Sequence, residues 1–370
     1  MANKKKLFFI VHGLSVGGAE KFLITIANLL NREIFEITII SLSQENPLKA
    51  DLLPHIQFIE IPRRSKLDVR PLLQLRKYIK LNKPQILFCV NFYTFFISTF
   101  ALLFTIAKTR RIISYHSTVH LSRKNHFLTK FYSFLVRKND LIITVSENQA
   151  IYTANRYKIN SSQFNTIHNG IETTWWKTSP NNLIKENIRK ELEIPLDSKV
   201  IVLTGAFRPE KNHLGAVKAL DILHKKFKTK AYLIFVGEGQ ERNQTEIFTN
   251  SLNLKKFVKF TGLQKDVRPF YWAADLFTLT SNSETFSIAA LEAMACGLPC
   301  VLTNVGGANE MIDKSFNGFL CTTDENDIAK KWADALKIPF NSKTISSKIH
   351  NQFSLEKMVS LYSKIFNELS

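Results

Sequence analysis

Short apolar runs alternate along the chain with longer segments in which apolar residues recur every three or four positions. The short runs predict buried strands, and the longer segments predict amphipathic helices. This alternation is typical of parallel sheets that helices cover on both faces. The expected strands are Leu7–Val11, Ile37–Ser41, Ile86–Val90, Ile112–Tyr115, Leu141–Val145, Val200–Thr204, Tyr232–Val236, Val258–Phe260, Leu276–Leu279 and Cys300–Thr303. Helices are expected between them, for example at Glu20–Leu30, Gly215–Phe227 and Ile288–Cys296.

The alternation runs through both halves of the 370 residues, which suffice for two or three domains of ordinary size. We therefore expect an α/β protein with two consecutive Rossmann-like, doubly wound parallel-sheet domains. Residues 1–172 form the first and residues 185–352 the second, joined by a polar linker at 173–184. Residues 353–370 are a separate segment, because Leu355–Leu369 reads as an amphipathic helix that must pack on a domain.

Residues 88–107 carry no charge and are long enough to cross a bilayer. Threonine, serine and asparagine dilute this stretch, and it also divides into the strand Ile86–Val90 and a helix near 95–106. We favour the strand and helix of a globular domain. The apolar run Leu7–Val11 is too short for a signal peptide. The sequence thus predicts a cytoplasmic protein, with peripheral attachment to the inner face of the membrane as a further expectation.

Composition narrows the class of protein. Hydrophobic residues make up 45% and charged residues 22%, which is typical of a globular chain. Four cysteines without a CxxC pair favour a reduced compartment over a disulfide framework. The net charge is +19, of which residues 1–180 carry +15. A strongly basic half attracts a polyanion, which is a nucleic acid, an anionic membrane or a phosphorylated substrate.

Two glycine-containing turns follow predicted strands. Gly17 and Gly18, in a run from Gly13 to Glu20, precede a helix whose N-terminus can face an anion. Gly205 begins the second turn, where Arg208 and Lys211 are three residues apart and suit a diphosphate. Taken alone, the first turn is as consistent with a tight turn as with an anion site. A charged run such as the second is usually a solvated turn.

The segment from Ser281 to Pro299 carries two glutamates eight residues apart, Glu284 and Glu292. Glu284 is expected in the loop or first turn and Glu292 deeper along the helix, so both could hydrogen-bond ligand hydroxyls. The backbone amides of Phe286, Ser287 and Ile288 would face a phosphate at the helix start. The plainer interpretation is that Glu284 only caps the helix and Glu292 is an ordinary surface residue. A glycine loop, Val305-Gly306-Gly307, follows the next strand.

His116 ends the strand Ile112–Tyr115, at the carboxyl edge where open α/β sheets bind ligands, and His12 ends the first strand in the same way. The sequence contains no HExxH, HxxEH or Asp-x-Asp pattern, so we assign no metal and no cofactor.

In order, the segments VGGAE, His116, VSEN, HNGIE, RPEKN, VGEG, FTG and SETFSIAALEAMACGLP resemble the retaining glycosyltransferases of family 4, over most of the chain. The resemblance implies a GT-B architecture, in which two Rossmann-like domains face each other across a cleft and the last helix crosses back to the first domain. It implies an acceptor on the N-terminal domain and a nucleotide-sugar donor on the C-terminal domain, without a metal. The acceptor would be a glycan or a lipid-linked sugar, in bacterial surface polysaccharide biosynthesis.

Carried over by this resemblance, Arg208 and Lys211 hold the donor diphosphate, and Gly17 and Gly18 adjoin it. Glu284 faces the transferred sugar, His116 lies beside it, and Glu292 binds the ribose. The catalytic candidates are Glu284, His116, Arg208 and Lys211. The donor-binding candidates are Gly17, Gly18, Gly205, Arg208, Lys211, Phe286, Ser287, Ile288 and Glu292. Two residues depart from the family, which commonly has Gly at Ser287 and an acidic or small residue at Asn304.

Fixed cations and amides aimed at the leaving diphosphate would lower the barrier to breaking the sugar–phosphate bond. The resemblance implies retention of the anomeric configuration, and we favour a UDP-sugar. Alternatives are a sugar-nucleotide epimerase of the same architecture, a silent sugar-binding subunit and a basic nucleic-acid or membrane binder. No nucleic-acid signature appears, so we expect no nucleic-acid partner. An anionic membrane is an expected partner, through Lys4–Lys6, Arg63/Arg64, Arg110/Arg111 and Arg123/Lys124.

Overall fold

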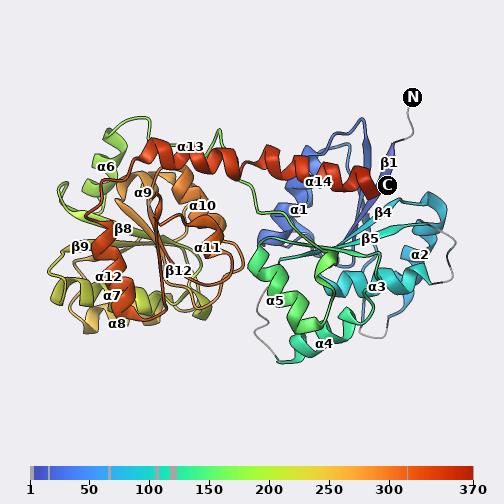
Figure 1. Ribbon diagram of the computed structural model, residues 1–370, viewed down its shortest axis with the longest axis horizontal. Helices are drawn as coiled ribbons and strands as arrows, with labels where there is room; N and C mark the ends of the chain where they lie inside the picture. Colours follow the sequence, from blue (N-terminus) through green and yellow to red (C-terminus); the bar gives the residue numbers. More distant parts are fainter. Residues whose placement is uncertain are drawn as a thin grey trace. The chain divides into compact units, whose positions relative to one another are not determined.

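The computed structural model describes residues 4–15, 17–65, 68–103, 105, 108–116, 123–314 and 316–369. At residues 123–126 it describes the backbone but not the side chains. The chain divides into two compact units: residues 1–168 with 356–370, and residues 169–355. Each unit is built on one sheet with helices on both of its faces (Figure 1).

The first unit has a seven-stranded parallel sheet in the order β3-β2-β1-β4-β5-β6-β7. Its strands are β1 (Lys5–Val11), β2 (Phe35–Ser41), β3 (Gln57–Glu60), β4 (Ile86–Val90), β5 (Arg110–Tyr115), β6 (Leu141–Thr144) and β7 (Phe164–Thr166). Its helices are α1 (Gly18–Leu29), α2 (Arg70–Asn82), α3 (Phe92–Leu102), α4 (Arg123–Ser133), α5 (Glu147–Tyr157) and α14 (Leu355–Leu369), with short 3-10 turns at Pro47–Asp51 and Ser161–Gln163.

The second unit has a six-stranded parallel sheet in the order β10-β9-β8-β11-β12-β13. Its strands are β8 (Lys199–Thr204), β9 (Ala231–Val236), β10 (Val258–Phe260), β11 (Leu276–Leu279), β12 (Cys300–Thr303) and β13 (Gly318–Cys321). Its helices are α6 (Leu183–Glu191), α7 (His213–Lys225), α8 (Arg242–Ser251), α9 (Arg268–Ala273), α10 (Ile288–Ala295), α11 (Ala308–Met311), α12 (Glu325–Ala335) and α13 (Ser342–Gln352), with a 3-10 turn at Pro209–Lys211. In Figure 1, α7, α8 and α12 cover one face of this sheet and α9, α10 and α13 the other.

The C-terminal helix α14 belongs to the first unit. Its buried residues Met358, Tyr362 and Phe366 are four apart and therefore share one face of the helix. The Phe366 ring lies 5.5 Å from the Phe88 ring of β4, and the Tyr362 ring lies 5.5 Å from the Phe22 ring of α1. The predicted return of the last helix to the first domain is confirmed.

The boundary between the units differs from the expected one. The structure places residues 169–172 in the second unit, because Ile171 forms a parallel bridge with Ser354 and donates its N–H to the Phe353 carbonyl at 2.8 Å. A Cβ on Gly170 would come within 2.6 Å of the Ser354 carbonyl oxygen, so this close approach requires glycine. The first domain therefore ends at His168, not at Glu172.

The segment 173–184 is not a free linker but is packed onto the second unit. The Arg268 guanidinium lies 3.4 Å from the centre of the Trp175 ring, and Trp272 Nε1 donates to the Lys177 carbonyl at 2.9 Å. A cation over an indole face is a stabilising contact that fixes this segment to α9.

No helix in the described part of the chain is long and apolar enough to cross a membrane. Residues 86–90 and 92–102 form β4 and α3, as the strand–helix interpretation predicts.

Candidate active site

The strand order of the second sheet reverses between β8 and β11. The chain continues from β8 outward through β9 and β10, and from β11 outward through β12 and β13 in the other direction. The loops after β8 and β11 therefore separate at a topological switch point, where open parallel sheets bind their ligands. Arg208 and Lys211 follow β8, and Glu284 follows β11.

The loop after β8 is tied to the end of β11 by one asparagine. Asn212 has a φ of 53°, and its Oδ1 accepts the Gly215 N–H at 3.1 Å, capping α7. Its Nδ2 donates to the Thr280 carbonyl at 3.2 Å, and the Thr280 hydroxyl donates to the Asn212 carbonyl at 2.9 Å. These bonds hold the Arg208–Lys211 turn in place.

Lys211 and Glu284 meet across this switch point. Lys211 Nζ lies 2.5 Å from Glu284 Oε1, and their side chains are 23% and 16% exposed. The Ser281 hydroxyl donates to the same carboxylate oxygen at 2.8 Å. Arg208, by contrast, is exposed and has no side-chain partner among the described residues. The site thus offers one preoriented lysine, one carboxyl group and one open guanidinium.

The glycine loop after β12 supports the Glu284 backbone. Gly306 has a φ of 57°, and a Cβ there would come within 2.2 Å of the Glu284 carbonyl oxygen. Gly307 donates its N–H to the Thr285 carbonyl at 2.8 Å. Only glycine allows this close approach, so the loop fixes the position from which Glu284 extends.

Ser287 is the N-cap of α10. Its hydroxyl accepts the Ala290 N–H at 3.2 Å, and the Glu284 loop ends at this residue. The departure from the family's usual glycine therefore has a structural role, because a serine cap satisfies one free N–H of the helix. Phe286 is buried before the cap, and Ile288 is partly exposed at the first position of the helix.

Glu292 lies one turn further along α10 and lines a second part of the site. The Tyr271 hydroxyl donates to Glu292 Oε2 at 3.4 Å and is 2.7 Å from the Thr204 hydroxyl. Burial, with a contribution from Glu292, raises the pKa of Tyr271 well above its usual value, so its hydroxyl keeps its proton.

Thr204, Tyr271 and Glu292 line a cavity of about 280 Å³ at the carboxyl ends of β8 and β9. Its lining includes Gly205, Gly237, Glu238, Leu263, Gln264, Tyr271 and Glu292. A pocket with a carboxylate, a neutral hydroxyl and glycine backbone has the groups that recognise a nucleoside.

The remaining candidates lie in the first unit. Gly17 is the N-cap of α1 and Gly18 is its first residue, with open space where a Cβ would stand. His116 follows β5, its Nε2 lies 2.8 Å from the Ser114 hydroxyl, and its ring is 4.3 Å from Phe22. Burial lowers the pKa of His116 to about 4, so its imidazole is neutral at pH 7.

The second unit therefore brings together Gly205, Arg208, Lys211, Glu284, Ser287 and Glu292 around one edge of its sheet, whereas Gly17, Gly18 and His116 belong to the first unit. Sequence reasoning missed Thr204, Tyr271 and Ser281. Thr204 ends a predicted strand and Ser281 closely follows one, which was a usable signal, but Tyr271 lies on a short helix with no pattern of its own.

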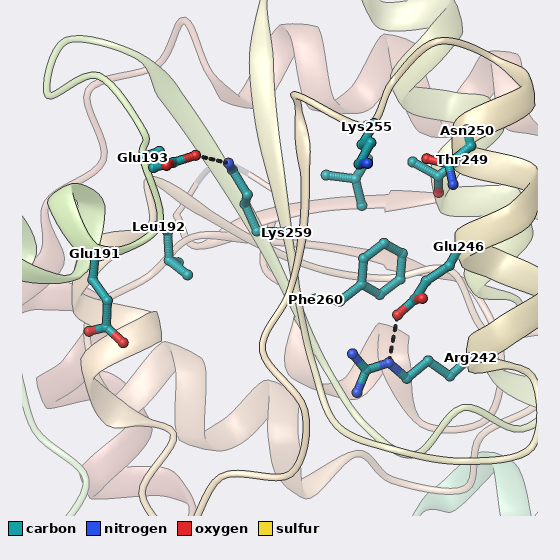
Figure 2. A pocket seen from close by; sticks show the side chains of 11 residues that line it. Glu191, Leu192, Glu193, Arg242, Glu246, Thr249, Asn250, Lys255, Lys259 and Phe260 are labelled. Atoms are coloured by element: carbon teal, nitrogen blue, oxygen red, sulfur yellow. Dashed lines mark hydrogen bonds and ion pairs between the residues drawn. The ribbon is translucent and has the colours of Figure 1, made fainter.

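A second hollow, of about 420 Å³, lies beside the edge strand β10 (Figure 2). Arg242 pairs there with Glu246 at 2.8 Å, and Lys259 with Glu193 at 3.8 Å. None of the candidate site residues lines it, and its charges largely neutralise one another.

Comparison with known proteins decides the family. The model described as glycosyl transferases group 1 matches residues 184–351, and the model described as Glycosyltransferase Family 4 matches residues 16–175. The chain belongs to the family 4 glycosyltransferases. The predicted family is thereby confirmed, and the two parallel sheets flanked by helices confirm the predicted pair of Rossmann-like domains.

Two curated enzymes and one solved structure illustrate the likeness. N-acetyl-alpha-D-glucosaminyl L-malate synthase of Bacillus anthracis is 29% identical over 248 residues, 65% of this glycosyltransferase and 63% of that enzyme. UDP-Gal:alpha-D-GlcNAc-diphosphoundecaprenol alpha-1,3-galactosyltransferase of Escherichia coli is 25% identical, covering 96% of this chain and 94% of that enzyme. The Anabaena HepE structure with UDP is similar in fold, with a TM-score of 0.80, 20% identity and coverage of 98% and 100%.

Proposed function

We propose that this glycosyltransferase moves a sugar from a UDP-sugar to a lipid-linked sugar, with retention of the anomeric configuration. The observation that most supports this proposal is the Lys211–Glu284 pair at the switch point of the second sheet. Glu292 and Tyr271 line a cavity at the same edge of that sheet. The pair offers a cation for a diphosphate and a carboxylate for sugar hydroxyls, and the cavity suits a nucleoside.

In this proposal Arg208 and Lys211 bind the diphosphate, because negative charge gathers there as the sugar–phosphate bond breaks. Lys211 is already held by Glu284 and needs little reorganisation when the donor enters. Glu284 binds the transferred sugar, and Glu292, oriented by Tyr271, accepts hydrogen bonds from the ribose hydroxyls. His116, neutral at pH 7, serves as a hydrogen-bonding group rather than a cation.

The choice of UDP is supported by the HepE complex, and the lipid-linked acceptor by the name of the Escherichia coli relative. Metal independence rests on the two cations and remains part of the proposal.

A membrane-facing role fits a lipid-linked acceptor, but of the expected cations only Arg110 lies on the surface that we favour. Arg111 is buried in an ion pair with Asp140, and Arg63 is partly buried against Tyr93. The side chains of Arg123 and Lys124 lie outside the described residues. A better surface is the basic patch, which we define as Lys108, Arg110, Arg137 and Lys138.

All four cations of the basic patch are exposed and line one hollow of about 660 Å³, where the single lining acid, Asp140, already pairs with Arg111. Phe131 and Phe134, just before it in the sequence, are 53% and 77% exposed. Cations beside exposed aromatic rings suit an anionic lipid surface at about 1 kcal/mol per cation. We propose peripheral attachment at the cytoplasmic leaflet through this patch.

A panel of nucleotide sugars, scored for nucleotide release with and without membrane extract as acceptor source, tests the activity. We expect nucleotide release from one UDP-sugar that depends on the acceptor. NMR of the product reads the anomeric configuration, which we expect to be retained. Epimerised donor without an acceptor would favour the epimerase, and an inverted product would contradict retention.

Vesicle co-sedimentation tests the attachment. Replacing Arg110, Arg137 and Lys138 by Gln should reduce binding to anionic vesicles about a hundredfold at low salt, because each cation contributes about fivefold. The same change at Lys228, Lys230 and Lys337 of the second unit is the control with equal net charge. Equal loss in both variants would show that only net charge matters and would contradict the patch.

A further inference from the structure

The first sheet has its own switch point. Its strand order reverses between β1 and β4, so the loops after these two strands separate at its carboxyl edge. His12 follows β1, and Asn91 follows β4. Neither the sequence motifs nor the donor site accounts for the polar residues that gather there.

Asn91 holds an unusual backbone at this edge. Its φ is 84° and its ψ is 168°, a region that glycine adopts but other residues avoid. Its Oδ1 accepts the N–H groups of Tyr93 at 3.0 Å and Thr94 at 3.1 Å. The strained residue thus caps α3 and fixes Tyr93 in its first turn.

Tyr93 in turn orients Arg63. The Tyr93 hydroxyl accepts a hydrogen bond from Arg63 Nη1 at 2.9 Å, and the Tyr93 ring stands edge-on to His12 with 5.6 Å between ring centres. The Arg63 backbone N–H donates to the Leu42 carbonyl, just after β2. Arg63, Tyr93 and His12 therefore follow three different strands, β3, β4 and β1, at the same edge of the sheet.

The charge of Arg63 is not compensated within the described residues. Arg63 is partly buried, its Nε is buried without a hydrogen-bond partner, and its one side-chain bond goes to a neutral hydroxyl. The nearby acids are used elsewhere, since Asp68 pairs with Arg70 and Glu60 with Lys49. A partly desolvated cation without a counter-ion costs free energy, which a bound anion would recover.

We propose that Arg63, held by Tyr93, whose ring in turn contacts His12, binds a phosphate group of the acceptor. A guanidinium presents two parallel donors to phosphate oxygens, and the neutral tyrosine orients it without cancelling its charge. The inference rests on the proposed function, because it narrows the acceptor class to sugars that a phosphate or diphosphate links to their carrier. Arg64, the next residue, is exposed and takes no part.

Geranyl diphosphate is a soluble probe for this site, with geraniol as the probe that lacks phosphate. Binding is measured by calorimetry in the Arg208→Gln/Lys211→Gln background, which removes the diphosphate cations of the second unit. Adding Arg63→Gln should weaken binding of geranyl diphosphate about ten- to a hundredfold, the loss of a charged hydrogen bond. Adding Arg64→Gln, with the same net charge, should change it less than twofold.

Two further variants keep the test independent of folding. Arg63→Lys retains the charge but not the two-donor geometry and should give an intermediate loss, and Tyr93→Phe should weaken binding severalfold while leaving the ring in place. Equal weakening by Arg63→Gln and Arg64→Gln, or no weakening by any Arg63 variant, would overturn the proposal. UDP binding and nucleotide release by the unmodified chain are measured separately, so a failure of the proposed function is distinguishable from a failure of this site.

Discussion

Lys211 Nζ and Glu284 Oε1, 73 residues apart in sequence, lie 2.5 Å from each other at the point where the strand order of the second sheet reverses. The contact joins the two loops that a parallel sheet opens for a ligand. In the proposed function, this contact places a cation for the diphosphate next to a carboxylate for the sugar. Lys211 carries the charge, and Glu284 both positions that charge and accepts hydrogen bonds.

Replacing Lys211 by Gln should lower the rate of nucleotide release about a hundred- to a thousandfold, because one preorganised donor to the leaving diphosphate is lost. The measurement is kcat/KM for the best UDP-sugar. Lys218→Gln removes a cation from the following helix α7, where Lys218 pairs with Glu325 of α12, and this matched control should keep full activity. Equal activity of the two variants would contradict the assignment.

Tyr271→Phe and Glu292→Gln should both raise the KM for the donor about tenfold with a smaller change in kcat, because the nucleoside is bound equally in the ground and transition states. Glu246→Gln changes a carboxylate in the other hollow and should leave KM unchanged (Figure 2). A KM that responds to Glu246 but not to Glu292 would place the nucleoside elsewhere.

Ser287→Ala should lower the free energy of unfolding by about 1 kcal/mol, since the cap of α10 is lost, and Ser287→Gly by only a few tenths. Both variants should bind UDP nearly as well as the unmodified chain. Denaturant unfolding and calorimetry check this. Loss of UDP affinity in Ser287→Gly without loss of stability would give the serine a direct role in binding the donor.

His213 should make the second unit sensitive to acid. Its ring stacks on Phe207 at 3.9 Å, neither of its nitrogens has a partner among the described residues, and burial lowers its pKa from 6.5 to about 4. Between these values the unfolded chain binds a proton that the folded chain does not, so stability is full above pH 6.5 and falls toward pH 4.

The difference between the unfolded and folded pKa values of His213 corresponds to at most about 3 kcal/mol of folding stability. Melting temperatures of the unmodified chain and of His213→Phe, measured from pH 7.5 to 4.5, check it. The variant should lose less stability on acidification, although His116 and His224, whose pKa values burial also lowers, keep part of the slope. Parallel pH profiles for the two proteins would show that His213 is not the group responsible.

Much of the fold could be predicted from the sequence because the central strands are uninterrupted apolar runs. The inner strands β4, β11 and β12 begin and end at the predicted residues, and so does the edge strand β10. The missed strands β3, β7 and β13 lie at sheet edges and have only three or four residues, and polar residues interrupt β3 and β7. The predicted domain boundary lies after the observed one because the bridge between Ile171 and Ser354 joins residues far apart in sequence, which no local pattern indicates.

The candidate site was predicted where chemistry and position coincide, as for Arg208, Lys211 and Glu284 after central strands. The Lys211–Glu284 pairing itself, the contact of Tyr271 with Glu292 and the orientation of Arg63 by Tyr93 depend on tertiary packing. Arg63 in particular has the sequence context of a surface cation, beside Arg64, and only the position of α3 distinguishes the two.

We propose that Arg208 and Lys211 of the second unit bind a nucleoside diphosphate without a divalent ion. Calorimetric titration of UDP in excess EDTA, into the unmodified chain and into Arg208→Gln/Lys211→Gln, tests it most directly. We expect one UDP to bind per chain. Binding should be at least about a hundredfold weaker in the double variant, because two charged hydrogen-bond donors are lost. Binding that needs added Mg²⁺, or that is unchanged in the double variant, would contradict it.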